Sequence, residues 1–252
     1  MNLVVVGAGE MGRWIADTVD AAVAFTDADP EIAADAAADR EARAVDPDTE
    51  ETFDAVCLAV PMSAVADAVA DYAPNAERAI FDISGIMADP LAAMADHAPD
   101  CERASLHPLF APPRVPGNVA VVPDADGPVL DAIYEDMREA GNTVFETTAA
   151  EHDDAMETVQ AGAHTAVLAY ALVAGDVREE FATPVSAQLT DVAATVTEGS
   201  PDVYSEIQSA FDGADAIVDA AERIAAADAE AFAALYNEAK TNVGTDERVR
   251  HE

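Results

Sequence analysis

The chain has 252 residues, and 51% of them are hydrophobic, which is enough to bury a core and excludes wholesale disorder. It is strongly acidic: 50 aspartates and glutamates stand against 12 lysines and arginines, for a net charge of −38. Phosphate binding needs clustered basic side chains, so this charge excludes nucleic acid as an expected partner.

The acidic residues are spread along the whole chain rather than gathered in a tail. Their mutual repulsion would destabilise the folded state in dilute buffer, and concentrated salt would screen it. With Lys240 as the single lysine and with abundant alanine, the composition resembles that of proteins from salt-accumulating halophiles. We prefer this interpretation to an acidic partner-binding surface.

No targeting or membrane segment is expected. No apolar run approaches the ~20 residues that a membrane helix needs, and no basic segment precedes the apolar start of the chain. We therefore expect a soluble, cytoplasmic protein without a membrane partner. Cys57 and Cys101 lack metal-ligand spacing, so no metal site is expected, and Cys57 lies in an apolar run typical of a core.

In residues 1–150, short apolar runs alternate with alanine-rich helical patterns. The predicted strands are Asn2–Val6, Ala22–Thr26, Ala55–Val60, Ala79–Ile83, Ala104–Leu106, Val119–Val122 and Thr143–Glu146. The predicted helices are Gly12–Val19, Pro30–Ala38, Ser63–Tyr72, Pro90–Ala95 and Pro128–Ala140. This alternation predicts an α/β domain with a parallel, doubly wound Rossmann sheet.

After Glu151 the pattern becomes entirely helical. Apolar positions between Asp153 and Val177 follow helical periodicity for about seven turns. Further helices are predicted at Pro184–Thr197, Pro201–Phe211 and Ala214–Ala239. We therefore expect a Rossmann domain over residues 1–150 and an all-helical domain over residues 151–245.

The first apolar run leads into a glycine motif, Gly7-Ala8-Gly9-Glu10-Met11-Gly12, which fits G-x-G-x-x-G between a strand and a helix. In this motif Gly7 permits a tight turn, Gly9 lets the backbone approach a pyrophosphate, and Gly12 allows close helix–strand packing. The helix start offers N–H groups and partial positive charge to the phosphates. Residues 7–12, with Glu10 and Met11 among them, are thus predicted to bind a dinucleotide.

Two other strand ends complete the predicted cofactor site. Asp27 lies 20 residues after Gly7, where an acid accepts hydrogen bonds from the adenosine ribose. Its charge repels a 2′-phosphate, and no arginine follows it before Arg40, which favours NAD over NADP. The next long strand ends in a run that we expect beside the nicotinamide ribose: Ala59, Val60 and Pro61.

His107 is the candidate general base. It ends a short strand and precedes a proline, which predicts a position in the cofactor crevice, and histidine titrates near neutral pH. Ser84, after the neighbouring strand, offers a hydroxyl to orient the imidazole or the substrate. His152 opens the helical half and is interpreted as a helix cap. Gln160 and His164, four residues apart, are expected to contact substrate or to hydrogen-bond between helices.

Taken together, these residues resemble the prephenate/arogenate dehydrogenase family, from the glycine turn to near the end of the chain. Ser105–Pro112 is similar to the histidine–proline motif of the family. Glu151–Met156, continuing to Gln160 and His164, and Ser200–Tyr204 are similar to two of its helical segments.

The resemblance implies an oxidoreductase of tyrosine biosynthesis, one of the enzymes of aromatic amino acid biosynthesis. Hydride would pass from C4 of prephenate to NAD, His107 would take the C4 hydroxyl proton, and carbon dioxide would leave as the ring becomes aromatic. The resemblance also implies that Gln160 and His164 face the substrate and that the helical domain forms a homodimer.

Two departures from the family pattern concern the substrate. Gly85 and Met87 stand where the family has a serine and a lysine, and Thr195 stands near the position of an arginine that pairs with a substrate carboxylate. A dianion needs cations, so Arg114 or Arg178 is expected to substitute.

Three alternatives stay open. One is arogenate as substrate, which differs from prephenate in carrying an amino group in place of the keto group. Another is a non-catalytic NAD-binding homologue that has lost the substrate site. The third is a β-hydroxyacid dehydrogenase, which would need a lysine in the helical domain that only Lys240 could supply.

Overall fold

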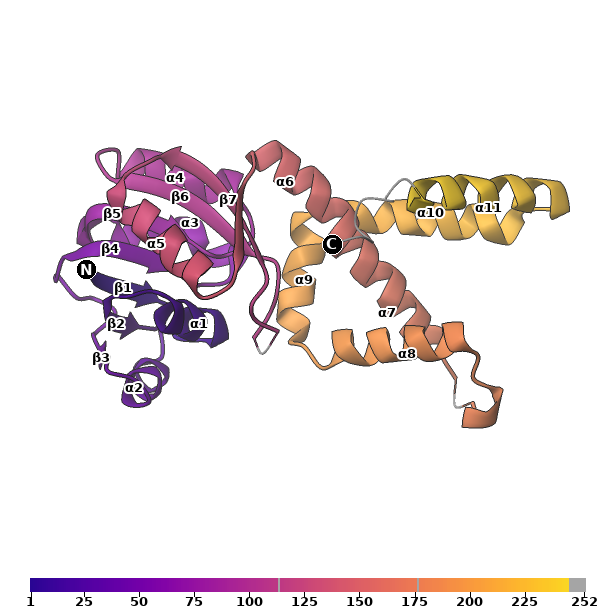
Figure 1. Cartoon of the computed structure of the whole chain (residues 1–252), viewed down its shortest axis with the longest axis horizontal. Coiled ribbons are helices and arrows are strands. Elements are labelled where there is room, and N and C mark those ends of the chain that lie inside the picture. Colours follow the sequence, from indigo (N-terminus) through magenta and orange to yellow (C-terminus); the bar gives the residue numbers. More distant parts are fainter. Residues whose placement is uncertain (113, 176, 245–252) are drawn as a thin grey trace. The chain divides into compact units, whose positions relative to one another are not determined.

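The computed structural model describes residues 1–112, 114–175 and 177–244, and the chain divides into two units, Met1–Ala155 and Met156–Glu252 (Figure 1). The division falls inside one helix, and the predicted last residue of the helical domain, residue 245, lies outside the described residues. In the part of the chain that is described, no helix is long and apolar enough to cross a membrane.

The first unit is built on one eight-stranded sheet in the order β3-β2-β1-β4-β5-β6-β7-β8. The strands are β1 (Asn2–Val6), β2 (Ala22–Thr26), β3 (Arg43–Ala44), β4 (Phe53–Leu58), β5 (Ala76–Asp82), β6 (Glu102–Pro108), β7 (Asn118–Ala125) and β8 (Thr143–Glu146). Neighbouring strands are parallel from β3 through β6, and β7 is parallel to β8. The predicted Rossmann sheet is therefore confirmed, with the two-residue strand β3 in addition.

One pair contradicts the expected all-parallel sheet. β7 runs antiparallel to β6, and His107 lies opposite Ala120 in their register. Parallel pairing needs a crossover long enough to return the chain to the same edge, usually through a helix. The described residues between these strands, 109–112 and 114–117, form no helix, so no helical crossover returns the chain to the same edge.

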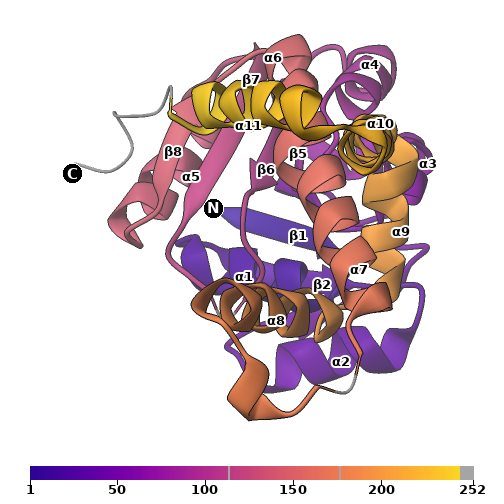
Figure 2. The same cartoon turned by 90° about the vertical axis from the view of Figure 1, so that its right-hand side faces the viewer.

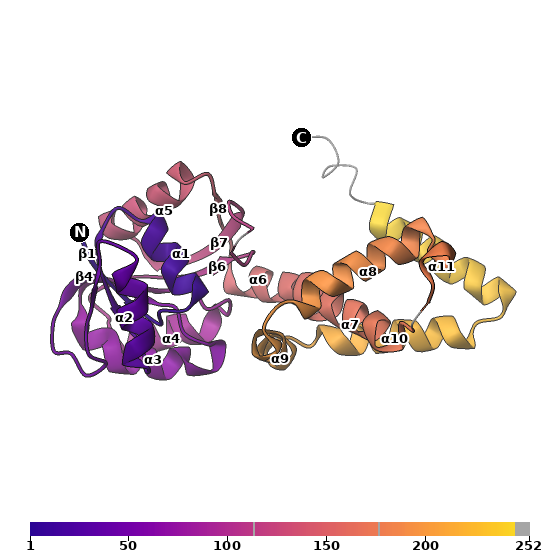
Figure 3. The same cartoon turned by 90° about the horizontal axis from the view of Figure 1, so that it is seen from below.

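Helices cover both faces of this sheet. They are α1 (Glu10–Thr18), α2 (Pro30–Ala38), α3 (Val65–Tyr72), α4 (Ala88–His97) and α5 (Pro128–Glu139), with short 3-10 turns at Met62–Ala64 and Ala73–Asn75. Residues of α1, α2 and α5 belong to the core on one face, and residues of α3 and α4 belong to the core on the other. Figure 3 shows α1 and α5 on the side of the first unit opposite to α3 and α4. Because β1 and β4 are buried on both faces, their sequences are almost continuously apolar.

The second unit is helical. α6 (Ala149–Met156) straddles the division, and a π-helical segment (Glu157–Gly162), α7 (Ala163–Val173), a 3-10 turn (Glu179–Phe181), α8 (Pro184–Thr197), α9 (Pro201–Ala210), α10 (Gly213–Ala226) and α11 (Ala229–Gly244) follow. Within this unit α7 packs against α8 and α10 (Figure 2).

Two predicted helices of this half are wrong in detail. The helix predicted from Asp153 to Val177 ends at Val173 and is widened at the π segment. The start of α10 packs there, because a Cβ on Gly213 would lie 1.8 Å from the carbonyl oxygen of Glu157. The helix predicted at Ala214–Ala239 is broken, because the carboxylate of Asp228 accepts the backbone N–H groups of Glu230 and Ala231 and starts a new helix there.

Candidate active site

The glycine turn lies at the carboxyl end of β1, which lies between β2 and β4, where the order of the strands reverses its direction. Gly7 has a φ of +95°, and a Cβ there would lie 2.3 Å from the carbonyl oxygen of Ala59. A Cβ on Gly12 would lie 1.9 Å from the carbonyl oxygen of Gly7. The fold itself therefore requires these two glycines.

Gly9 differs from both, because a Cβ there would meet no atom within 4 Å. It precedes α1, which begins at Glu10 with no side-chain cap on its N–H groups. An open backbone before an uncapped helix start is the arrangement that binds phosphate groups. The open backbone at Gly9 and the helix start at Glu10 and Met11 therefore fit the pyrophosphate of a dinucleotide.

Asp27 lies beside this turn at the carboxyl end of β2. Its Oδ2 accepts the backbone N–H of Ala8 at 2.8 Å, and its Oδ1 accepts that of Asp29 at 3.0 Å. At the end of β4, the N–H of Ala59 donates to the carbonyl of Val6 at 2.7 Å. The predicted residues of the glycine turn, Asp27 and the β4 end (including Val60 and Pro61) therefore share one edge of the sheet.

His107 lies at the carboxyl end of β6, which is the same edge, because β1, β4, β5 and β6 are parallel. Its side chain is buried, with only 7% of the residue exposed. Nδ1 lies 2.9 Å from Nε2 of His152, and Nε2 faces Gly85, where a Cβ would come within 3.1 Å. Burial and the nearby His152 lower the pKa of His107 to about 3, so the ring is neutral at physiological pH.

The interpretation of His152 as a helix cap is wrong. The residue lies one turn inside α6 and is 3% exposed, with its ring against that of His107 at a centroid separation of 5.1 Å. Its Nδ1 lies 2.9 Å from Oδ1 of Asp153. The paired His152-Asp153 within the family-like helical motif was the available signal, and sequence reasoning did not use it.

Ser84 is bonded to a buried acid. Its hydroxyl and its backbone N–H both donate to Oδ2 of Asp82, while Gly85 is the residue that lies against the imidazole of His107. Burial raises the pKa of Asp82 to about 6, and the bonds from Ser84 oppose that shift.

The second unit holds the other predicted polar residues. The ring of His164, in α7, meets that of Tyr204 edge-on at 4.8 Å, so the structure brings two of the family-like segments together. Nδ1 of His164 is buried and has no hydrogen-bond partner among the described residues, and burial lowers the pKa of this histidine. Gln160 lies in the π segment before it. The His164 ring therefore keeps a nitrogen that is open to a hydrogen bond in a half-buried place.

The candidate cations lie in exposed segments. Arg114 is exposed in the loop after β6, where its backbone N–H donates to the carbonyl of Ala111. The guanidinium of Arg178 stacks over the ring of Phe181 at 4.8 Å. Thr195 is half-buried in α8.

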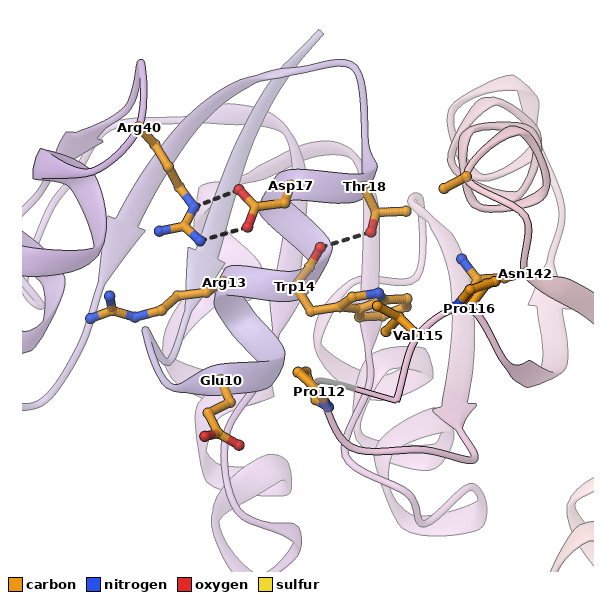
Figure 4. A pocket seen from close by; sticks show the side chains of 11 residues that line it. Glu10, Arg13, Trp14, Asp17, Thr18, Arg40, Pro112, Val115, Pro116 and Asn142 are labelled. Carbon is orange, nitrogen blue, oxygen red and sulfur yellow. Dashed lines mark hydrogen bonds and ion pairs between the residues drawn. The ribbon is translucent and has the colours of Figure 1, made fainter.

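A cavity of about 590 Å³ lies beside α1 in the first unit (Figure 4). Its lining residues are Glu10, Arg13, Trp14, Asp17, Thr18, Arg40, Pro112, Val115, Pro116, Ala140 and Asn142. Asp17 and Arg40 form an ion pair at its edge. Of the predicted site residues only Glu10 lines this cavity, so it is distinct from the space around His107 and Asp27.

The chain is similar in sequence and in fold to known dehydrogenases. The chain is 30% identical over 214 residues to a 4-amino-4-deoxyprephenate dehydrogenase from Streptomyces pristinaespiralis, covering 76% of this chain and 71% of that protein. The fold is similar to that of the prephenate dehydrogenase of A. aeolicus solved with hydroxyphenyl propionate and NAD+ (TM-score 0.71, 14% identity, 98% of each chain). It is also similar to that of Synechocystis arogenate dehydrogenase (TM-score 0.66, 14% identity, 97% of this chain and 99% of that one). No family model matches.

Proposed function

The chain belongs to the prephenate/arogenate dehydrogenase family, and on that premise we propose that it catalyses the NAD-dependent oxidative decarboxylation of prephenate to 4-hydroxyphenylpyruvate. The observation that carries the proposal is the position of His107. Its imidazole is buried and neutral, and it lies at the same edge of the sheet as the glycine turn, whose backbone is open at Gly9. This combination supports a base that works beside a dinucleotide.

In the proposed reaction, Nε2 of His107 takes the proton of the C4 hydroxyl. The hydride of C4 would pass to NAD held at the glycine turn. The bond from C1 to its carboxylate then breaks and carbon dioxide leaves. The electron pair of that bond completes the aromatic ring, and protonated His107 returns the proton to the C4 oxygen. General base catalysis of this kind contributes about 10²–10⁴-fold, and holding C4 in near-attack geometry supplies much of the remaining acceleration. Ser84, at the end of the neighbouring strand, orients the imidazole or the substrate in this proposal, and its bond to Asp82 holds its hydroxyl in place.

Asp27 supports NAD rather than NADP as the cofactor. Two backbone N–H groups fix its carboxylate beside the glycine turn, where a 2′-phosphate would meet its negative charge. The ribose hydroxyls of NAD, by contrast, can donate to the same carboxylate.

We assign substrate binding to Gln160 and His164 from the helical unit and to Arg114 from the loop after β6. The unpartnered Nδ1 of His164 supports this, because a buried ring nitrogen without a hydrogen bond is costly unless a ligand completes it. Arg114 offers an exposed guanidinium, and bidentate arginine suits a carboxylate.

A homodimer is part of the proposal. The helical unit exposes large apolar side chains on most of its helices, more than a water-exposed surface normally tolerates. They are Val159, Leu172, Val173, Val177, Phe181, Val185, Leu189, Val192, Val203, Val218, Ile224, Phe232, Tyr236 and Val243. A second copy of the helical unit would cover such a surface.

Two other substrates compete with prephenate. The relative in S. pristinaespiralis, by its name, acts on 4-amino-4-deoxyprephenate, which carries an amino group at C4. Arogenate carries its amino group on the side chain, and Thr195 in place of the family arginine favours a substrate with less net negative charge.

The test is NADH formation by the purified protein in molar salt with each of the three substrates and with NAD or NADP. We expect the highest kcat/KM with prephenate and NAD, and mass spectrometry should identify 4-hydroxyphenylpyruvate. A clear preference for one of the two amino compounds would replace prephenate as the substrate. Tight NAD binding without turnover of any substrate would instead show a non-catalytic homologue.

A further inference from the structure

Behind the proposed base, three side chains form a continuous chain of hydrogen-bonding contacts. Nδ1 of His107 lies 2.9 Å from Nε2 of His152, and Nδ1 of His152 lies 2.9 Å from Oδ1 of Asp153. The side chain of His152 is 1% exposed, whereas that of Asp153 is 41% exposed. The contacts therefore run from the buried base to a carboxylate at the surface.

When both imidazoles are neutral, the chemistry of the three groups fixes the direction of these bonds. A carboxylate only accepts, so Nδ1 of His152 must carry a proton to bond with Asp153. In neutral His152 the other nitrogen, Nε2, is then an acceptor. Nδ1 of His107 must in turn donate to it, which leaves the lone pair of His107 on Nε2.

We propose that His152 and Asp153 are positioning residues that hold His107 in the tautomer whose Nε2 accepts the substrate proton. The inference rests on the proposed function, because it concerns how the base of that reaction is set. Nε2 is the nitrogen that faces Gly85, away from His152, so the bonds leave the reactive nitrogen uncommitted to His152.

The intervening imidazole has a consequence that a direct carboxylate partner would not have. A carboxylate next to His107 would raise the pKa of the base and favour the imidazolium, which cannot accept a proton. Neutral His152 fixes the tautomer without that effect. When Nε2 takes the proton, the new imidazolium donates through Nδ1 to His152, and Asp153 supplies a negative charge beyond it.

Substitutions at two positions separate this role from simple packing. His152→Leu fills a similar volume with an apolar side chain that has no acceptor, whereas the carboxamide oxygen of His152→Gln can still accept from Nδ1 of His107. Loss of a group that orients a functional histidine typically costs about 10- to 100-fold in activity. We expect a decrease of that size in kcat for His152→Leu, and kcat within about threefold of the wild type for His152→Gln.

Asp153→Asn removes the charge but keeps an oxygen that can accept from His152, so its kcat should fall by less than that of His152→Leu. Asp154→Asn is the matched control, because Asp154 is the next acid along the helix and is exposed. Its kcat should equal that of the wild type.

The decisive readout is the ¹⁵N NMR spectrum of protein labelled at histidine, which has only five histidines to resolve. The expected spectrum shows His107 protonated at Nδ1 and bare at Nε2 in the wild type, and a mixture of tautomers in His152→Leu. A wild-type His107 protonated at Nε2 would overturn the proposal, as would equal losses of kcat in the leucine and glutamine variants. Should His152→Leu fail to fold, the wild-type and Asp153→Asn spectra still decide.

This spectrum also separates the two proposals. The tautomer is measured without substrate, so the expected spectrum in a protein that turns over none of the three substrates would contradict the function and leave the positioning intact. Turnover with an unchanged tautomer in His152→Leu would contradict the positioning alone.

Discussion

The two units of the chain bury their apolar side chains to different degrees. In the first unit, Leu3, Val56 and Phe81 are fully buried between helices on both sides of the sheet, whereas Leu172 and Val173 in the second are 86% and 81% exposed. The first unit thus has a core of its own. The second exposes the kind of surface that a partner covers, so its stability is expected to depend on association.

The same contrast applies to the polar groups. Asp27 and His107 are held by backbone N–H groups and by a neighbouring side chain of their own unit. His164 instead keeps a buried nitrogen without a partner among the described residues. The comparison indicates that the proposed cofactor and base residues are preorganised by one fold, while the proposed substrate residue His164 has a nitrogen that a ligand could complete.

The largest expected effect is on association through the helical unit. Leu172→Asp would bury an unpaired charge in the proposed dimer interface, and the dimer dissociation constant should rise at least about 100-fold, which corresponds to about 2.7 kcal/mol. Sedimentation in molar salt measures this. Ile32→Asp, at a 41% exposed apolar side chain of the first unit, is the matched control and should leave the dimer intact. A monomeric wild type would remove the contrast drawn here.

A smaller effect is expected in the glycine turn, where two neighbouring glycines have different roles. Gly9→Ala enters open space, so the free energy of unfolding should change by less than about 0.5 kcal/mol, while the Kd of NAD rises about tenfold. Gly7→Ala meets the Ala59 carbonyl in a left-handed conformation and should destabilise the first unit by about 2 kcal/mol. Calorimetric titration with NAD and chemical denaturation measure the two quantities. An unchanged Kd for Gly9→Ala would contradict the proposed pyrophosphate site.

The smallest effect concerns the buried acid of the first unit. The pKa of Asp82 is raised to about 6 in the folded state. Its stabilising contribution is therefore fully present below the unfolded pKa of about 4 and is lost as pH rises through about 6. Between pH 7 and pH 5 the wild type should gain about 1 kcal/mol from this group that Asp82→Asn lacks.

Denaturation of both proteins across that range measures the difference. Because the pKa of His107 is lowered in the folded state, the free energy of unfolding also falls as pH drops below about 6.5. This contribution is the same in both proteins and cancels in the comparison. A difference between wild type and Asp82→Asn that stays constant from pH 7 to pH 5 would contradict the raised pKa.

Much of the first unit could be predicted from sequence, because its signals are local. Continuous apolar runs such as Asn2–Val6 indicate strands buried on both faces, and the glycine turn follows one of them directly. The position of His107 at a strand end followed from its own neighbours. The antiparallel direction of β7 was readable too, from the absence of a helical pattern in residues 109–117, but the general alternation of strands and helices outweighed it.

Contacts between distant residues could not be predicted in this way. His107 and His152 are 45 residues apart and meet only because the register of β6 and the start of α6 bring them together. The π segment likewise depends on Gly213, far along the chain, whose missing side chain lets α10 begin against it.

The break at Asp228, by contrast, has a local capping signal in the sequence, which the surrounding alanine-rich pattern concealed.

The central claim is that His107 is the base of an NAD-dependent oxidation, and the most direct measurement is the kcat of His107→Asn at saturating NAD and prephenate. Asparagine keeps a polar group near Nδ1 but has nothing at the position of Nε2. We predict a kcat at least about 100-fold below that of the wild type with an unchanged Kd for NAD. A kcat within two- or threefold of the wild type would contradict the account.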